Sequence, residues 1–448
     1  GALWIVNSTK AMDAGIAAFL SRMQSLERFR LIRTVGVNNI ILIAMTLMFS
    51  LFGGIFGMSE ECIAFVAISI PLAISMGYDS ITGVGMVYVG AHVGFAGAFL
   101  NPFTIGVAQE MAELPLFSGM GYRLVCWAVL TIFLITVLLW YASRIRKSPE
   151  KSPMYELDSF WRNRVAADTE SIVPYRNTGS KVSFALAMTA IVLFTVFYSK
   201  DCSINIGDES FRAAWLMPST CILFAVLSVA SLRKSVHYFI VNLLAFTIIY
   251  LVIGALCFKW YIPEISALFL ALAILSGIAS GAGANKIANE FIAGAKDIFS
   301  AAFIVGLASG IIIILQDGKI IDTILHSMES ALHGAGKTAS LALMYGVQTF
   351  INLFIPSATA KAAITMPVMA PFSDLIGLSR QATVLAFQFG DGFTNMITPT
   401  SGVLMAVLGM ARIPYGKWVK WAWKLIAALI VLGFILLLPP VFFGFDGF

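Results

Sequence analysis

Charge is scarce in this chain. Of its 448 residues only 12% are charged and 59% are hydrophobic, whereas a soluble globular domain usually carries about 25% charged residues. The mean hydropathy is +0.88, and many apolar runs reach the roughly 20 residues that are needed to cross a bilayer. The sequence therefore excludes a soluble domain and predicts an all-α polytopic membrane protein that lies in the lipid bilayer.

The patterns typical of enzymes are absent as well. The five cysteines form no CxxC pair and lie mostly in apolar runs, which is typical of small buried hydrophobic side chains. We find no metal-ligand spacing, no catalytic triad and no nucleotide-binding loop, because Gly281-Ala282-Gly283 follows an apolar helix and not a strand. The net charge of +5 is expected on cytoplasmic loops. We therefore expect no enzymatic activity, no cofactor, no metal beyond Na+, and no nucleic-acid partner.

The chain does contain an internal repeat, because residues 52–112 appear a second time at residues 352–411. The copies share prolines and glycines at equal spacing, which are Pro71 and Pro371, Gly77 and Gly377, and Gly90 and Gly390. Glu61 falls opposite Lys361, and Asn101-Pro102 matches Thr398-Pro399 once a short gap is allowed. Sites near the midplane between two inverted repeats are a hallmark of secondary transporters.

Each copy predicts a re-entrant hairpin, which is two short apolar arms around a polar tip. The first hairpin spans about 34–76 with its tip at Ser59–Glu61, and the second spans about 338–376 with its tip at Ser357–Lys361. Irregular backbone is tolerated at membrane depth only where it is buried in protein or lines a cavity. The polar tips are therefore expected to face a central site.

A broken transmembrane helix follows each hairpin. The first spans about 80–112 and breaks near Ala98–Thr104, and the second spans about 380–411 and is interrupted between Asp391 and Ser401. The residues expected to cap these two helices are Asp79 and Ser379. The other expected spans are about 122–142, 182–198, 212–231, 238–257, 263–281, 299–316 and 418–440, with an amphipathic segment at 319–334.

The positive residues predict the topology. The loop at 148–181 is rich in arginine and lysine and is therefore placed in the cytoplasm. Counting spans outward from it makes the first hairpin enter from the cytoplasm and the second from outside. The predicted domains are a first repeat at 1–147, the loop, and a second repeat with scaffold helices at 182–448. Residues 1–13 align with 310–322, so we expect at least one more N-terminal helix in the natural protein.

Ionisable groups at membrane depth are costly and need a partner or a purpose. The candidates are Glu60, Glu61, Lys361 and Asp391. Contact with substrate or a proton is one interpretation, and an internal salt bridge between Glu61 and Lys361 is the other. His92 is a candidate for proton handling, with a packed, hydrogen-bonded histidine as the alternative.

The two breaks supply further candidate ligands. A proline removes a backbone donor and frees a carbonyl, and freed carbonyls with hydroxyl and amide oxygens can coordinate Na+. Half-helix N-termini can bind a carboxylate. The remaining predicted site residues are Asn101, Pro102, Thr104, Asn395, Thr398, Thr400 and Ser401, together with Ser59, Ser357 and Thr359 at the tips.

Several segments resemble one transporter family. GMSEE, PLAISMGYDSITG, VGFAGAFLNPF and TMPVMAPFSDLIGLSRQATVLAFQFGDGFTNMITPTSGVLMA are similar to the YfcC-like branch of the anaerobic dicarboxylate carrier family, within the ion transporter superfamily. The resemblance implies an inverted-repeat fold, a homodimer, and an elevator motion of a transport domain against a scaffold. It also implies a multi-pass protein of a bacterial inner (plasma) membrane, with the site at the tips and breaks named above.

The substrate stays open at this point. The family name implies dicarboxylates, whereas members of the branch resemble arginine/ornithine exchangers. Three acids against one lysine favour a basic amino acid by charge complementarity, and Lys361 favours an organic anion. The coupling ion, where one is used, is expected to be Na+ or H+. Lys361 can also replace a coupling cation, in which case exchange needs no Na+. A channel is the third hypothesis.

Overall fold

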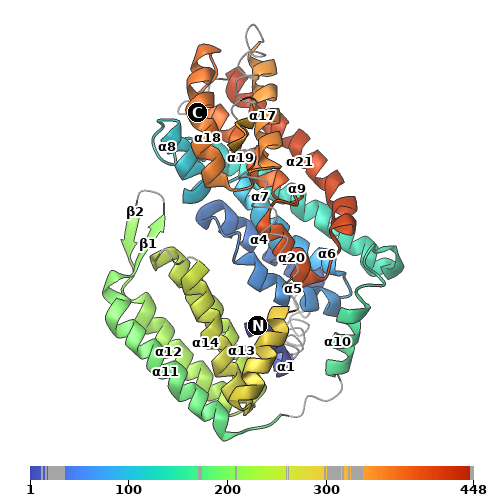
Figure 1. The fold of residues 1–448 in the computed structure, drawn as a ribbon, viewed down its shortest axis with the longest axis vertical. Helices are drawn as coiled ribbons and strands as arrows, with labels where there is room; N and C mark the ends of the chain where they lie inside the picture. The colour runs from blue at the N-terminus through green and yellow to red at the C-terminus, as the bar shows by residue number, and fades with distance from the viewer. Residues whose placement is uncertain are drawn as a thin grey trace. The chain divides into compact units, whose positions relative to one another are not determined.

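The computed structural model describes residues 1–11, 14, 15, 18, 36–169, 174–206, 209–258, 260, 262–296, 299, 314, 317–320, 323 and 336–443. They are predominantly helical (Figure 1). The chain divides into two compact units, one of residues 1–37 and 160–299 and one of residues 38–159 and 300–448. Both hairpins and both broken helices belong to the second unit. The division into repeats at 1–147 and 182–448 is a prediction about sequence symmetry and is not tested by this grouping.

The first unit is a set of packed helices. They are α1 (Ala2–Ser8), α11 (Thr178–Tyr198), α12 (Leu216–Leu232), α13 (Val236–Phe258) and α14 (Ile262–Ser280), and α10 (Ser159–Thr169) begins at the boundary between the units. The helix α11 packs on α12 and α14, while α1 packs on α14 through Ile5 and Ala273. A β-hairpin of β1 (Ser203–Ile206) and β2 (Glu209–Arg212) is the one departure from the all-α expectation among the described residues. Its strands are too short to change the helical class.

The two predicted hairpins correspond to two pairs of helices, and their re-entrant course in a membrane stays a prediction. The first consists of α4 (Val37–Phe56) and α5 (Cys62–Ser75), and the second of α17 (Lys337–Asn352) and α18 (Ala358–Leu375). Their observed ends agree with the predicted ends to within one helical turn. In Figure 1, α17 and α18 lie beside α19, the helix that follows them.

Both helix breaks are confirmed. The first helix runs through α6 (Ser80–Val84), the π-helical turn η2 (Gly85–Val89) and α7 (Gly90–Ala96), and it resumes after the break in η3 (Pro102–Gly106) and α8 (Val107–Met111). The second consists of α19 (Arg380–Thr394) and α20 (Gly402–Ala411). The expected N-caps are also confirmed, because Asp79 accepts from the Thr82 amide and Ser379 accepts from the Ala382 amide.

The start of the second break was predicted too early. Asp391 lies inside α19, and its carbonyl still accepts the helical hydrogen bond from the Asn395 amide at 3.1 Å. The reason is the position of the proline. The ring of Pro399 conflicts with the carbonyl four residues earlier, at Asn395, so the helix continues to Thr394.

Five helices in the described part of the chain are long and apolar enough to cross a membrane. They are α4, α9 (Met120–Lys147), the Thr178–Asp201 and Val236–Gly254 segments, and α21 (Tyr415–Phe443). The helices α9, α11, α12, α13, α14 and α21 match predicted spans. The span expected at 299–316 and the segment at 319–334 fall mostly outside the described residues. The predicted loop at 148–181 contains α10, and its cytoplasmic side stays a prediction.

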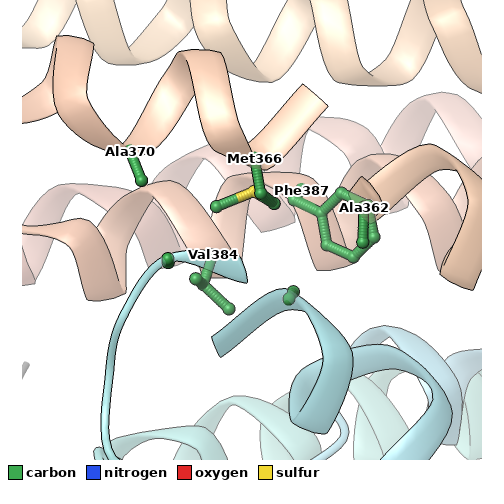
Figure 2. Packing of buried hydrophobic residues seen from close by; sticks show 7 residues of the cluster. Ala362, Met366, Ala370, Val384 and Phe387 are labelled. Carbon is green, nitrogen blue, oxygen red and sulfur yellow. The ribbon is translucent and has the colours of Figure 1, made fainter. Parts of the chain in front are cut away.

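Small residues allow the broken helices to pack closely. A Cβ atom on Gly392 of α19 would lie 2.6 Å from the Ala96 side chain of α7, and one on Gly94 would lie 2.0 Å from the Ser50 carbonyl oxygen of α4. The helices therefore touch through their backbones at these points. Beside this crossing, α18, α19 and α8 share an apolar cluster that includes Met366, Val384 and Ala108 (Figure 2). The second hairpin tip contacts both breaks, through the Thr359 hydroxyl and the Pro356 carbonyl.

Candidate functional site

A series of hydrogen-bonded residues, here called the polar chain, joins the first hairpin tip to the second broken helix. The Ser59 hydroxyl lies 3.5 Å from His92 Nε2, and His92 Nδ1 lies 3.0 Å from the Tyr88 carbonyl oxygen. The Tyr88 hydroxyl donates to the backbone carbonyl of Asn395 at 2.8 Å. The side-chain amide nitrogen of Asn395 donates to Asp391 Oδ2 at 3.3 Å. Four residues predicted from the sequence are thus brought together, with Tyr88 as the connection.

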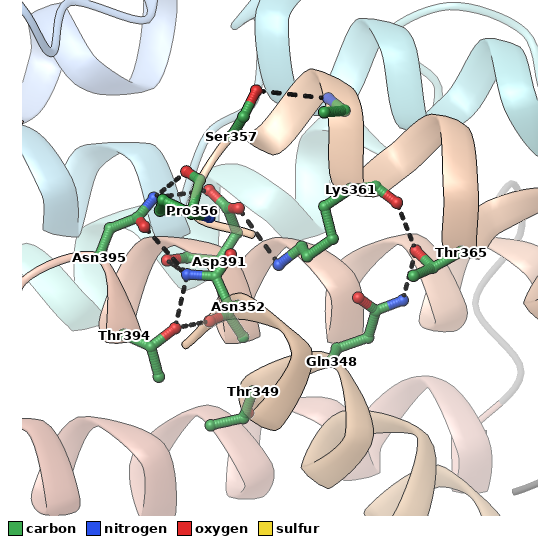
Figure 3. A network of polar contacts seen from close by, with 12 residues as sticks. Gln348, Thr349, Asn352, Pro356, Ser357, Lys361, Thr365, Asp391, Thr394 and Asn395 are labelled. Carbon is green, nitrogen blue, oxygen red and sulfur yellow. Dashed lines mark hydrogen bonds and ion pairs between the residues drawn. The ribbon is translucent and has the colours of Figure 1, made fainter. Parts of the chain in front are cut away.

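A buried ion pair lies at the end of this chain. Lys361 Nζ, on the first turn of α18, is 3.2 Å from Asp391 Oδ1 on α19, and both side chains are fully buried (Figure 3). Both atoms lack an aligned hydrogen bond, so the contact has the distance of an ion pair without the angles of a hydrogen bond. Lys361 Nζ also lies 4.6 Å from the centre of the Phe387 ring, where a cation is attracted by the aromatic face. The internal salt bridge considered from the sequence therefore forms with Asp391 and not with Glu61.

Asn352 at the end of α17 organises the second tip. Its amide nitrogen donates to the Asp391 carbonyl at 3.1 Å, to the Thr394 hydroxyl at 2.7 Å and to Asn395 Oδ1 at 3.0 Å. The Asn395 amide donates in turn to the Pro356 carbonyl at 3.1 Å. One asparagine thus holds the end of α19, and a second asparagine ties it to the hairpin tip.

Four buried polar atoms of this cluster have no hydrogen-bond partner among the described residues. They are Lys361 Nζ, Asp391 Oδ1, Gln348 Oε1 and Asn352 Oδ1. Buried polar groups are hydrogen-bonded in the great majority of cases, so each exception calls for a reason. Three of these atoms are acceptor oxygens and the fourth is a cation. The cluster therefore has the composition of a cation-binding centre.

The first tip carries the accessible negative charge of the site. Glu60 is exposed and Glu61 is half-buried, and the Ser59 amide donates to Glu61 Oε2 at 3.1 Å. Within the described ranges, both carboxylates lack a lysine or arginine partner. Negative charge at this tip is thus available to a ligand that approaches Ser59.

The first break is held by Asn101. Its amide nitrogen donates to a carbonyl of α4 at 3.1 Å, and its Oδ1 accepts from the amides of Phe103 and Thr104 at 2.8 and 3.3 Å. The Thr359 hydroxyl of the second hairpin donates to the Phe103 carbonyl at 3.4 Å. The Thr104 hydroxyl is buried without a partner. Pro102 begins the π-helical turn η3, and its side chain lies outside the described residues.

The hydroxyl groups of the second break bind the protein's own backbone. Thr398 and Thr400 both donate to the Leu353 carbonyl, at 2.8 and 2.7 Å. Ser401 caps α20 by accepting from the Leu404 amide at 3.3 Å, and Ser357 caps α18. These oxygens therefore stabilise the tip and the break in this conformation.

A second buried network holds the end of α7. Gln388 donates to the carbonyls of Phe95 and Ala98, at 3.2 and 2.8 Å, where the helix breaks. The Arg123 guanidinium, which is fully buried on α9, donates to the side-chain oxygens of Gln388 and Gln381. Gln388 thus binds two carbonyls at the break, of which the Phe95 carbonyl also accepts from the Ala98 amide at 3.2 Å.

The sequence patterns did not identify the glutamines and the asparagine of these networks (Gln348, Gln381, Gln388 and Asn352) or Arg123. Asn352 and Gln348 belong to the arm of a predicted hairpin, where they were treated as part of an apolar run. Gln348 and Asn352 are four residues apart and therefore lie on one face of the helix. This spacing was the signal in the sequence that could have indicated a polar face. Arg123 begins a span, where an arginine usually reaches the interface. No group of three or more His, Cys, Asp or Glu side chains that could hold a metal gathers within the described residues.

Outside the membrane-spanning segments, Arg380 links three helix ends. It donates to Asp374 at the end of α18 and to Glu113 and the Ala112 carbonyl after α8. These carboxylates raise the pKa of the guanidinium above its ordinary value. The pair with Glu113 is largely exposed, so it contributes little to stability.

A known protein family matches almost the whole chain. Residues 1–441 match the family described as “C4-dicarboxylate anaerobic carrier” (DcuC). The chain is 33% identical over 457 residues to an Escherichia coli (strain K12) protein named “Putative basic amino acid antiporter YfcC”, covering 99% of this chain and 76% of that protein. It is 26% identical to an uncharacterized protein of Haemophilus influenzae, over 98% and 73% of the two chains.

Two solved structures are similar at 15% identity. They are the Alcanivorax borkumensis YdaH transporter, with a TM-score of 0.43 over 99% of this chain and 85% of that one, and Neisseria gonorrhoeae MtrF, with a TM-score of 0.42 over 98% and 80%. The helices, the family match and the curated relatives together define a membrane transporter, a multi-pass protein of a bacterial inner membrane. The chain belongs to the C4-dicarboxylate anaerobic carrier family, which confirms the resemblance seen in the sequence.

Proposed function

We propose that this chain is a secondary active transporter that exchanges basic amino acids across the membrane. The observation that carries the proposal is the polar chain from Ser59 through His92 and Asn395 to Asp391. It connects one hairpin tip to the opposite helix break, and sites of secondary transporters are typically built from such discontinuous helices. The name of the Escherichia coli relative, a putative basic amino acid antiporter, supports the substrate class.

Charge at the site favours a cationic substrate. The Lys361 ammonium is already within 3.2 Å of Asp391, so this pair is neutral as a unit. The charges that stay accessible are the carboxylates of Glu60 and Glu61 at the first tip. A guanidinium or ammonium group can pair with these carboxylates, whereas a dicarboxylate would be repelled by them.

The alternating-access mechanism that we propose is an elevator motion. In this proposal the unit of residues 38–159 and 300–448 carries the substrate, and the unit of residues 1–37 and 160–299 is the scaffold. The division of the chain into two compact units supports it, because the hairpins, the breaks and the polar chain all belong to one of them. The same proposal includes a homodimer in which two copies of the protein associate through their scaffold units.

The second candidate is a carrier of dicarboxylates or related organic anions. The description of the matched family favours it, and Lys361 would be the group that binds the anion. Lys361 is buried beside Asp391, however, and would have to leave this partner first. The first candidate needs no such rearrangement.

Counterflow in proteoliposomes separates the candidates. Uptake of labelled arginine that is driven by internal ornithine and saturates with concentration is expected, and succinate exchange without arginine exchange would overturn the proposal. Uptake that never saturates would indicate a channel.

A charge variant locates the substrate in the same assay. We expect Glu61→Gln to raise the KM for arginine about tenfold or more, because a hydrogen bond to a charged group contributes about 1.5–3 kcal/mol. The matched control is Glu110→Gln, since Glu110 is an exposed carboxylate outside the site. An unchanged KM in Glu61→Gln would remove the first tip from the substrate site.

A further inference from the structure

The Lys361 side chain lies where a bound cation would be expected. It projects from the first turn of α18 toward Asp391 of α19, and it is fully buried (Figure 3). A carboxylate, Asp391, is its closest oppositely charged group at 3.2 Å. Removing both charges from water is costly, so neither stays ionised at this depth without the other.

The side-chain amides of Gln348 and Asn352 use their nitrogens in hydrogen bonds and leave their oxygens without partners. The Gln348 side-chain nitrogen donates to the Thr365 hydroxyl at 3.0 Å and to the Met369 sulfur at 2.9 Å. The Asn352 side-chain nitrogen donates to the three acceptors described above. The remaining atoms, Gln348 Oε1 and Asn352 Oδ1, are buried acceptors without partners. Carboxylate and amide oxygens are the ligands that hard cations take in proteins.

The loose geometry of the ion pair supports this interpretation. Lys361 Nζ is at ion-pair distance from Asp391 but has no aligned hydrogen bond there. A salt bridge that only fixes two helices gains most from well-formed hydrogen bonds. The Phe387 ring 4.6 Å away attracts any positive charge at this position and gives no direction to a hydrogen bond.

We propose that the Lys361 ammonium is the resident cation of this centre, occupying the position beside Asp391 that a coupling Na+ would otherwise take. The inference rests on the proposed function and deepens it. Because a tethered cation cannot be released, the site keeps the same charge on both sides of the membrane. Transport then draws no energy from a sodium gradient, and the counter-substrate drives it.

The experiment compares wild-type protein with Lys361→Ala in sodium and in choline medium. The wild type should exchange arginine at the same rate in both. Lys361→Ala should exchange arginine at least about tenfold faster in sodium than in choline. A tenfold difference corresponds to about 1.4 kcal/mol of selective binding of sodium. Lys337→Ala is the matched control, because Lys337 is an exposed lysine at the start of α17. It should behave as the wild type does.

Thermal unfolding of the purified protein gives a second measurement that needs no transport. Sodium chloride, compared with choline chloride, should raise the Tm of Lys361→Ala and leave the wild type and Lys361→Ala/Asp391→Asn unchanged. A wild type that needs sodium for exchange would overturn the inference, and so would a Lys361→Ala variant whose Tm and exchange rate are equal in both media. If the wild type exchanges no amino acid, the proposed function fails, while the Tm of Lys361→Ala still decides whether a cation site is present.

Discussion

At the scale of single residues, the site depends on two charges that are buried together. Removing one partner of a buried ion pair typically destabilises a protein by about 3–5 kcal/mol, whereas replacing both by neutral groups is often tolerated. Lys361 and Asp391 are both fully buried. Single and double variants therefore separate the contribution of the pair to stability from its contribution to transport.

We expect Asp391→Asn to abolish exchange while the protein is still expressed and inserted. Its Tm should fall, because the Lys361 ammonium loses its counter-charge. The double variant Lys361→Gln/Asp391→Asn should regain the Tm without regaining exchange. Counterflow and thermal unfolding of the same preparations test this, and wild-type transport by Asp391→Asn would remove Asp391 from the site.

One hydroxyl group connects the two broken helices. Tyr88→Phe removes the bond to the Asn395 backbone carbonyl and the hydrogen bond with the Ser401 side chain, and the expected loss of stability is about 1 kcal/mol for each net bond. Exchange should slow more than this loss explains, because the second break is released. Tyr122→Phe is the matched control, since Tyr122 donates to the Leu436 carbonyl away from the site. Equal turnover in the two variants would show that the Tyr88 bond is purely structural.

The sequence located several residues that the structure brings together, and their role in binding stays a prediction. The polar chain contains Ser59, His92, Asp391 and Asn395. Each of them belongs to a hairpin tip or to a broken helix that the repeat had located. The pairing of Lys361 with Asp391 could not be predicted. It depends on how α18 packs on α19, and a charge pattern alone favoured Glu61 through symmetry.

At the scale of helices, close backbone contacts set the positions of the hairpins. Gly94→Ala would place a Cβ atom 2.0 Å from the Ser50 carbonyl oxygen, so α7 would have to move away from α4. We expect a loss of several degrees in Tm and reduced exchange. Gly346→Ala on α17 is the matched control, because a Cβ there meets nothing within 4 Å.

An alanine in an open helical position stabilises by about 0.5–1 kcal/mol relative to glycine. Gly346→Ala should therefore raise the Tm slightly and leave exchange intact. If Gly94→Ala unfolds at the wild-type temperature, the two helices do not touch as described.

The helices themselves were largely predictable from the sequence. Apolar runs, the caps Asp79 and Ser379, and the prolines located both hairpins and both breaks. The extension of α19 to Thr394 was missed, because Pro399 disturbs the helix only back to Asn395. The strands β1 and β2 were missed because each has four residues, which is too short for a clear alternating pattern.

At the scale of the whole molecule, the two compact units are expected to move relative to each other during transport. The five native cysteines are buried, so labels can be directed to cysteines introduced at exposed positions. A pair at Lys200 and Lys151, one in each unit, should report at least two distances whose populations change with arginine. A pair at Lys151 and Glu110, both in the second unit, should report a single distance. One unchanging distance between the units in the presence of substrate would contradict the elevator proposal.

The central claim is that a basic amino acid binds between the first hairpin tip and the second break. The most direct test is an experimental density map of the protein with arginine. The account predicts ligand density next to Glu61, with the Lys361–Asp391 pair still closed. Density within the unit of residues 1–37 and 160–299, or density that replaces Asp391 as the partner of Lys361, would contradict it.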